Sequence, residues 1–456
     1  MSPTQFFQIV MSLTGPVNLS KTMEELKWEN LKREFSWPRF FQTLLLVCAF
    51  SFFDTVTDFW YASSVDEDVC PLSNNLTSPC GGLEYFQVQN LTYIFISLPT
   101  IMLMTTSLDM KCASFMDYAV WPRCCNRSFL RAVAGVMFSL FYMLLNLFSV
   151  ISVIFDYVSA IDYVSVITFG LAIVYTIPIL GIKFLALFAH GPEMKKLMVR
   201  TTSYECQFKS ALQLWLLAWI LQGSGQYKGP IWLSSALSSI LLIGKSGAEG
   251  SLTFREQIDF EKVPFKRKLG LLLWFAPVHI LSALFRIISL ALITDRYLVF
   301  PWLALALGLP VIVLVTLKLA RLESLEDLTT GYILLSVFGE LTSITLWGGK
   351  TREAGRNFCL AMAAFILLLN SVFLSIIISD PAEGVVYQQA NTLNLAQFWK
   401  TEAIFCLCCG WLTFPLVVMQ MWKTGTMSVT TETALSMDQT LKTNRPQKEF
   451  IVRFSK

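Results

Sequence analysis

Charge is scarce in this sequence. Asp, Glu, Lys and Arg make up 15% of its 456 residues, whereas hydrophobic residues make up 54%. Soluble globular domains usually carry about 25% charged residues. One buried core cannot account for so large a deficit, so the composition excludes an ordinary soluble protein and predicts a protein that crosses a lipid bilayer. The small net charge of +3 gives no reason to expect a nucleic-acid partner.

Residue types and motifs that enzymes depend on are also scarce. The chain has only two histidines, His190 and His279, and it contains no Walker loop, no GxSxG and no HExxH motif. Its 11 cysteines do not show the spacing of a zinc site. We therefore expect no catalysis, no bound metal and no cofactor.

Long apolar runs dominate what is present. A membrane-spanning helix needs about 20 apolar residues. Runs that look complete cover residues 40–62, 132–155, 158–189, 231–244, 269–293, 298–319, 358–378 and 403–422. Runs that are short or interrupted cover 91–108, 208–221 and 331–347. The pattern predicts an all-α, polytopic transmembrane bundle over residues 39–423, with about 8–10 spans and one or more short or re-entrant helices.

The loops indicate an orientation. The loop after the first run is acidic, has no Lys or Arg, and holds Cys70, Cys80 and a sequon at Asn75. These features favour the exoplasmic side, with a Cys70–Cys80 disulfide and glycosylation of Asn75. Later basic loops favour the cytosol. We therefore expect a cytosolic N-terminal segment, residues 1–38, and a cytosolic C-terminal tail, residues 424–456.

Several ionisable residues interrupt the apolar runs. Each costs about 2.5–3.5 kcal/mol at the centre of a membrane helix, so each is expected to face protein or water. Asp54 and Asp58 are four residues apart and share a helix face, although a solvated helix end also fits them. Lys183 either faces the interior or snorkels to the cytosol. Glu205 and Lys209 have the i, i+4 spacing of an ion pair.

Two further charges lie deep in their runs. Arg286 and Glu340 are each flanked by apolar residues and are expected to face a polar interior. We hypothesise that Arg286 pairs with Glu340 or with Asp58. A separate polar face is formed by four serines of one run, which serve either helix packing or a hydrophilic path: Ser234, Ser235, Ser238 and Ser239.

The order of these features resembles the XK-related family of polytopic membrane proteins. Residues 53–60, Phe-Asp-Thr-Val-Thr-Asp-Phe-Trp, are similar to the acidic D-x-x-x-D segment of the family's first helix. Residues 210–217, which include Gln213, resemble its E-S-A-P-Q-L-x-L-Q segment, with Lys209 in place of the Glu and Leu212 in place of the Pro. Residues 284–293 resemble S-R-V-x-x-L-A-L-F, and residues 338–347 resemble F-x-E-N-x-x-x-x-x-L-W, with Leu341 in place of the Asn.

The resemblance implies a phospholipid scramblase of the plasma membrane, which moves lipid passively and without ATP. Its partners would be membrane lipids, together with a single-span partner subunit or a second copy of the chain. The polar furrow for the lipid headgroup would be lined by Asp54, Asp58, Lys183, Lys209, Gln213, Arg286 and Glu340. The same residues leave two alternatives open, a passive channel or secondary transporter for ions or small solutes, and a non-transporting receptor or partner subunit.

Overall fold

A computed structural model describes residues 35–65, 70, 83–119, 161–189, 191–224, 229–255, 265–297, 352–379 and 400–421. Across these ranges the only regular secondary structure is helical, so the predicted all-α fold is confirmed. The elements, with π-helical segments marked η, are α4 (Trp37–Thr43), η1 (Leu44–Ala49), α5 (Phe50–Ser64), α6 (Tyr85–Ala119), α8 (Ile161–Phe188), α9 (Pro192–Glu205), η2 (Cys206–Ser210), α10 (Ala211–Ser224), α11 (Pro230–Gly250), η3 (Ser251–Arg255), α12 (Phe265–Tyr297), α15 (Arg352–Ser379) and the helix Lys400–Met421.

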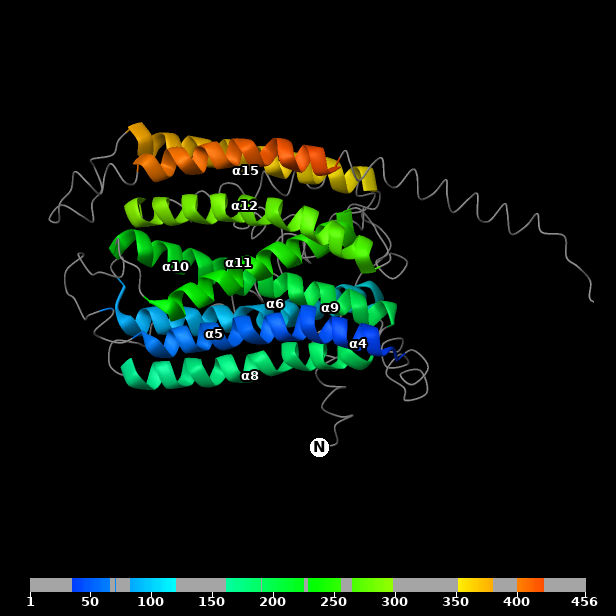
Figure 1. Cartoon of the computed structure of the whole chain (residues 1–456). Helices are drawn as coiled ribbons and strands as arrows, with labels where there is room; N and C mark the ends of the chain where they lie inside the picture. Colours follow the sequence, from blue (N-terminus) through cyan, green and yellow to red (C-terminus); the bar gives the residue numbers. More distant parts are fainter. Residues whose placement is uncertain are drawn as a thin grey trace, which may run out of the picture.

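The helices lie side by side with their axes nearly parallel (Figure 1). In the described part of the chain, six are long and apolar enough to cross a bilayer, and each coincides with a run predicted to be complete. They are Trp37–Ser64, Val166–Phe188, Pro230–Thr253, Lys266–Thr294, Cys359–Ser379 and Lys400–Met421. The predicted spans 132–155 and 298–319 and the interrupted run 331–347, with Glu340, lie outside the described residues.

Two segments that were expected to be short are instead long helices. The run 91–108 lies within α6, which has 35 residues and continues through Pro99. The run 208–221 belongs to a helical stretch that extends without a break from α9 through η2 into α10. The apolar runs underestimate these lengths because each helix continues into polar residues beyond its run, which a hydropathy count excludes.

The helix α5 has its polar residues inside and its apolar residues outside. Phe52, Phe53 and Trp60 are 58%, 55% and 57% exposed, whereas Asp54 and Asp58 are 0% exposed. A helix on the surface of a water-soluble protein shows the reverse.

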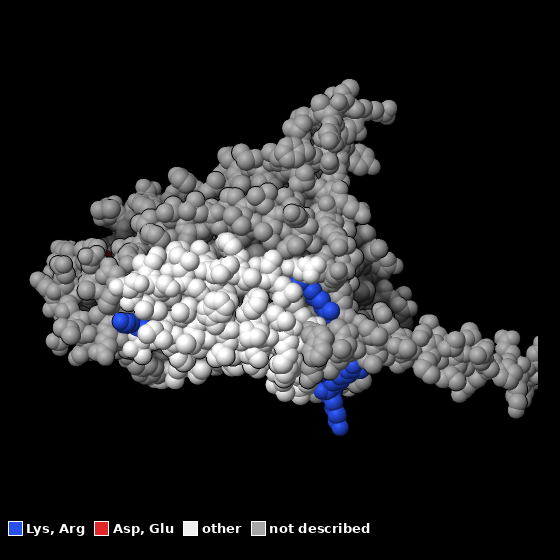
Figure 2. Space-filling model, turned by 90° about the horizontal axis from the view of Figure 1, so that it is seen from above, with Lys and Arg blue, Asp and Glu red and all other residues white. Residues whose placement is uncertain are grey.

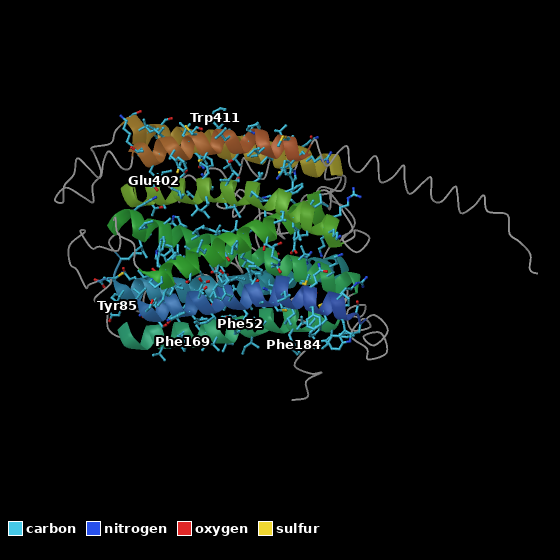
Figure 3. The ribbon with its side chains drawn as sticks, in the orientation of Figure 1. Phe52, Tyr85, Phe169, Phe184, Glu402 and Trp411 are labelled. Carbon is cyan, nitrogen blue, oxygen red and sulfur yellow. The ribbon has the colours of Figure 1, made fainter. Side chains whose placement is uncertain are left out.

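Other described helices also present apolar side chains to the outside. The labelled Phe169 and Phe184 point away from the bundle on one side and Trp411 on the other (Figure 3). In the face seen in Figure 2, the described surface is largely free of charged side chains, with Lys and Arg near its ends. The exterior therefore suits lipid.

Side chains of neighbouring helices form hydrogen bonds with the backbone of two proline-containing helices. A proline inside a helix lacks the N–H that would bond the carbonyl four residues before it, and its ring disturbs that turn of the helix. Thr100 of α6 donates to the carbonyl of Tyr175, three residues before Pro178 in α8. In the same way Gln420 Nε2 donates at 2.8 Å to the carbonyl of Trp274, three residues before the proline of α12. Each bond reaches the carbonyl next to the one that the proline leaves without its helical donor, and it links the disturbed turn to the neighbouring helix.

The bundle has two differently built halves around α12. On one side, Phe285 and Leu292 of α12 form an apolar cluster with Phe373 and Leu374 of α15. Gly410 of the Lys400–Met421 helix lies so close to the Phe285 ring that a Cβ there would overlap it. On the other side, α12 packs on α10 and α11, and these in turn reach α5 and α6. This second side holds the charged residues.

Candidate functional site: a buried charge network

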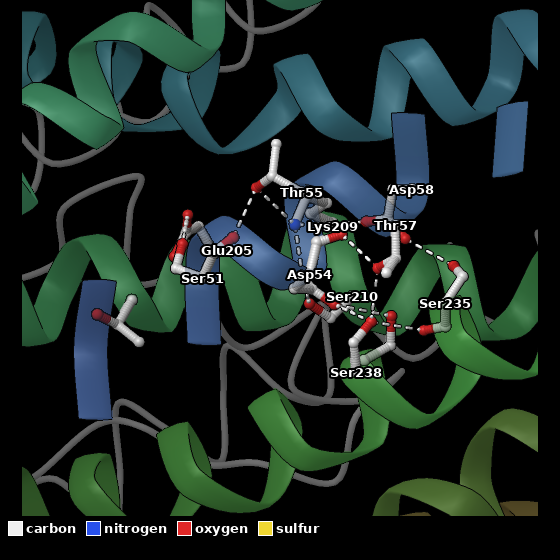
Figure 4. A network of polar contacts seen from close by, with 12 residues as sticks. Ser51, Asp54, Thr55, Thr57, Asp58, Glu205, Lys209, Ser210, Ser235 and Ser238 are labelled. Atoms are coloured by element: carbon white, nitrogen blue, oxygen red, sulfur yellow. Dashed lines mark hydrogen bonds and ion pairs between the residues drawn. The ribbon is translucent and has the colours of Figure 1, made fainter. Parts of the chain in front are cut away.

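The carboxylates of α5 form the centre of a buried polar network (Figure 4). Asp54 and Asp58 are both fully buried, so the interpretation of a solvated helix end is wrong. Four residues separate them, and the helix periodicity therefore places both on the face that meets η2 and α11. Ser51 and Thr55 lie on the same buried face and extend the polar stripe.

Lys209 of η2 neutralises these carboxylates. Its Nζ forms an ion pair with Asp54 and lies 3.3 Å from Asp58 Oδ2, and it donates to Thr55 Oγ1 at 3.2 Å. The predicted i, i+4 pair between Lys209 and Glu205 is wrong, because each of these charges pairs with a different helix. The two residues flank the start of a π-helical turn, which is wider than an α-turn and changes the side-chain spacing.

The serines of α11 bind the carboxylates of α5. Ser238 Oγ donates to Asp54 Oδ1 at 2.8 Å, and Ser235 Oγ donates to Asp58 Oδ1 at 2.6 Å. Ser239 contacts Asp54 Oδ1 at 3.4 Å, a weaker geometry. Ser234 does not join them and donates instead to the Pro230 carbonyl of its own helix. Three of the four predicted serines therefore belong to the charge network. Ser210 of η2 adds a 3.2 Å bond to Asp54 Oδ2.

A second ion pair lies next to the first. Lys183 of α8 pairs with Glu205 of α9, and both contact Ser51, which donates to Glu205 Oε1 at 2.7 Å. Lys183 is 1% exposed, so the expectation that it snorkels to the cytosol is wrong. Because Ser51 and Asp54 lie one turn apart on α5, the two ion pairs form one continuous buried network.

Negative charges outnumber positive charges among the contacting side chains of this network. Three carboxylates, those of Asp54, Asp58 and Glu205, share the ammonium groups of Lys183 and Lys209. All five residues are at most 2% exposed. An isolated charge is expensive to bury, so their mutual contacts and the serine hydroxyls stabilise them. Asp54 receives several hydrogen bonds, whereas Asp58 receives one from Ser235 and none at Oδ2.

Two other predicted path residues, Gln213 and Arg286, are also buried. Gln213 of α10 is 1% exposed, and neither atom of its amide forms a hydrogen bond. Arg286 of α12 is fully buried, as expected. Asp58 pairs with Lys209 in place of Arg286, and Glu340 lies outside the described residues, so the Arg286–Glu340 pair stays a prediction.

Of the residues that carry the predicted exoplasmic features, the structure describes Cys70. Cys70 is buried at 1% exposure, but Cys80 and Asn75 lie outside the described residues. The disulfide and the glycosylation stay predictions.

Sequence reasoning missed part of the network. It did not identify Ser51 and Thr55, although positions 51, 54, 55 and 58 have the i, i+3, i+4, i+7 spacing of one helix face and are all polar. It named Glu205 but assigned it the wrong partner. That partner, Lys183, is 22 residues away on another helix, a distance that no local pattern spans.

Within the described residues, no group of three or more His, Cys, Asp or Glu side chains could hold a metal ion. Comparisons with protein-family models, with curated proteins and with solved structures found no match. The resemblance to the XK-related family therefore stays a prediction, and functional inference depends on the network itself.

Proposed function

We propose that this membrane protein transports phospholipids between the leaflets, passively and without ATP, by exposing the buried charge network to lipid headgroups. One observation carries the proposal: α5 has the network on its inner face and apolar side chains on its outer face. A single helix thus separates the buried carboxylates of Asp54 and Asp58 from its own exposed apolar face.

The energetic problem of scrambling is the headgroup. Moving a polar group into hydrocarbon without a compensating hydrogen bond costs about 2–7 kcal/mol, and a charged group costs more. Hydroxyls and charges along α5 and α11 would replace part of the headgroup's hydration. The described network is closed, because its charged residues are at most 2% exposed. Transport therefore requires α5 to rotate or to separate from α11, so that the Asp54–Ser238 contact faces lipid.

The position of the network favours lipid over a soluble solute. A path for ions or small solutes runs along the inside of a bundle, whereas a path for lipid must open sideways to let the acyl chains remain in the bilayer. The outer face of α5 is already apolar along the network, with Phe52, Phe53 and Val56 all exposed. The acyl chains could remain against this surface.

The test is reconstitution of the purified full chain into vesicles that contain a fluorescent phospholipid. Dithionite bleaches only the outer leaflet, and scrambling lets it bleach inner-leaflet lipid as well. We expect bleaching beyond the outer-leaflet fraction without ATP. A trapped soluble fluorophore that stays unbleached shows that the vesicles exclude dithionite. Bleaching confined to the outer leaflet, with folded protein present, would contradict the proposal; bleaching of the trapped fluorophore would favour a channel.

A further inference from the structure

A polar contact joins the two halves of the bundle near one of its ends. Gln222 of α10 is 3% exposed, and its Nε2 donates at 3.3 Å to Oε1 of Glu402, the third residue of the Lys400–Met421 helix. Figure 3 shows Glu402 at the same end of the bundle as Tyr85, the first residue of α6. Because α10 belongs to the half with the charge network and the last helix belongs to the apolar half, this contact links the two.

The contact leaves two acceptor atoms without a donor. Gln222 Oε1 and Glu402 Oε2 are both covered, and neither forms a hydrogen bond. Each is bonded to the same carbon as an atom of the 3.3 Å bond, so both belong to one junction. An ionised carboxylate offers only acceptors, and an amide oxygen is also an acceptor. With Glu402 ionised, the two oxygens would therefore lack partners, although buried polar groups nearly always have them.

Glu402 also lacks a cation. In the part of the chain that the structure describes, the carboxylates of the charge network contact lysine ammonium groups, whereas Glu402 contacts none. Lys400 is exposed, and Cys406, one turn further along the helix, is the titratable neighbour on the inner side. Around Ala403 and Cys406, α12 and α15 contribute apolar side chains, and α10 presents the neutral Gln222. Such surroundings favour the neutral form of a carboxyl group.

One proton satisfies both oxygens. A protonated carboxyl group has an O–H donor, so Glu402 Oε2 can donate to Gln222 Oε1 while Glu402 Oε1 still accepts from Nε2. The last torsions of Glu and Gln rotate easily, so the two flat groups can face each other. The length of 3.3 Å fits a neutral pair, because hydrogen bonds to a charged carboxylate are usually shorter. We propose that Glu402 is a proton-binding site, and that its proton, shared with Gln222, joins the two halves of the bundle.

A metal cation fits the same two oxygens less well. Calcium takes about 6–8 oxygen ligands, whereas Gln222 and Glu402 supply one free oxygen each. No third His, Cys, Asp or Glu side chain completes a metal site in the described residues. A proton needs neither further ligands nor a cavity, so it suits a closely packed junction.

The test is infrared spectroscopy of the full chain in nanodiscs at neutral pH, in H₂O and in D₂O. A protonated carboxyl group has a carbonyl band that is separate from the amide and carboxylate bands and shifts in D₂O. We expect this band in the wild type and its loss in Glu402→Gln. Glu249→Gln is the matched control. The Glu249 carboxylate lies 3.6 Å from the Lys245 ammonium, so it is expected to be ionised and its removal should leave the band unchanged.

Replacing the partner tests whether the proton is shared. Gln222→Met removes the donor and the acceptor that face Glu402, so the carboxyl band should move to higher frequency as its hydrogen bonds are lost. Gln213→Met is the matched control, because it removes a glutamine of the same helix whose amide forms no hydrogen bond. It should leave the band in place. A band that does not move in Gln222→Met would overturn the pairing with Gln222.

Two further results would overturn the proton site. The first is a wild-type spectrum at neutral pH without a band that Glu402→Gln removes, which would show that Glu402 is ionised. The second is an unfolding midpoint that sodium or calcium chloride raises, relative to choline chloride of equal ionic strength, in the wild type but not in Glu402→Gln. That result would assign the two oxygens to a metal cation. A proton at Glu402 is independent of lipid transport, so these measurements decide the site whether or not the chain scrambles lipid.

Discussion

The two sides of α12 are held together by different chemistry. Toward α15 and the Lys400–Met421 helix, the contacts are mainly an apolar cluster and the close approach of Gly410 to Phe285, together with a 3.3 Å hydrogen bond from Gln222 to Glu402. Toward α5, the bundle instead encloses two ion pairs, Lys209–Asp54 and Lys183–Glu205. The first side shows that this chain can join helices largely through apolar contacts. Since replacing a buried ion pair with apolar residues is often neutral or stabilising, the charged side is best explained by function.

The largest expected effect comes from removing the cation of the charged side. Lys209→Met leaves two buried carboxylates without their ammonium, which should cost about 3–5 kcal/mol in the free energy of unfolding. Unfolding in mixed detergent micelles measures this loss. Adding Asp54→Asn and Asp58→Asn to the same chain removes the uncompensated charge, so the triple variant should recover most of the stability. A triple variant as unstable as the single variant would show that Lys209 stabilises by packing alone.

A smaller effect is expected on the apolar side. Gly410→Ala places a Cβ against the Phe285 ring and should destabilise by about 1–3 kcal/mol through overpacking. Gly181→Ala is the matched control, because a Cβ there meets nothing within 4 Å and alanine favours the helix. In a Phe285→Leu background the cost of Gly410→Ala should decrease. An unchanged cost in that background would argue against the contact between Gly410 and Phe285.

The smallest effect distinguishes two neighbouring serines. Ser238→Ala removes the 2.8 Å bond to Asp54 and should cost about 1 kcal/mol, near the range measured for hydrogen bonds between membrane helices. Ser239→Ala removes only the 3.4 Å contact and should cost less. Both variants delete one hydroxyl from the same buried face, so their unfolding midpoints are directly comparable. Equal losses would mean that the geometry of the Asp54 carboxylate differs from that described.

The sequence predicted the helices better than their contacts. Apolar runs located all six described spans, because hydrocarbon thickness imposes a minimum length on each. Burial of Asp54, Asp58 and Arg286 was also predictable, since a charge in such a run must face inward. The partners were not. Lys183 and Glu205 meet only because α8 packs against α9, and the π-turn at Lys209 redirects its side chain away from Glu205. Such pairings depend on tertiary packing, which local spacing does not encode.

The central claim is that the buried charges serve lipid transport and are not required for assembly. The triple variant Lys209→Met, Asp54→Asn, Asp58→Asn tests it most directly when it is reconstituted beside the wild type and assayed with fluorescent lipid and dithionite. We expect a folded protein with an unfolding midpoint close to that of the wild type and with bleaching confined to the outer leaflet. A folded triple variant that scrambles lipid as fast as the wild type would contradict the claim.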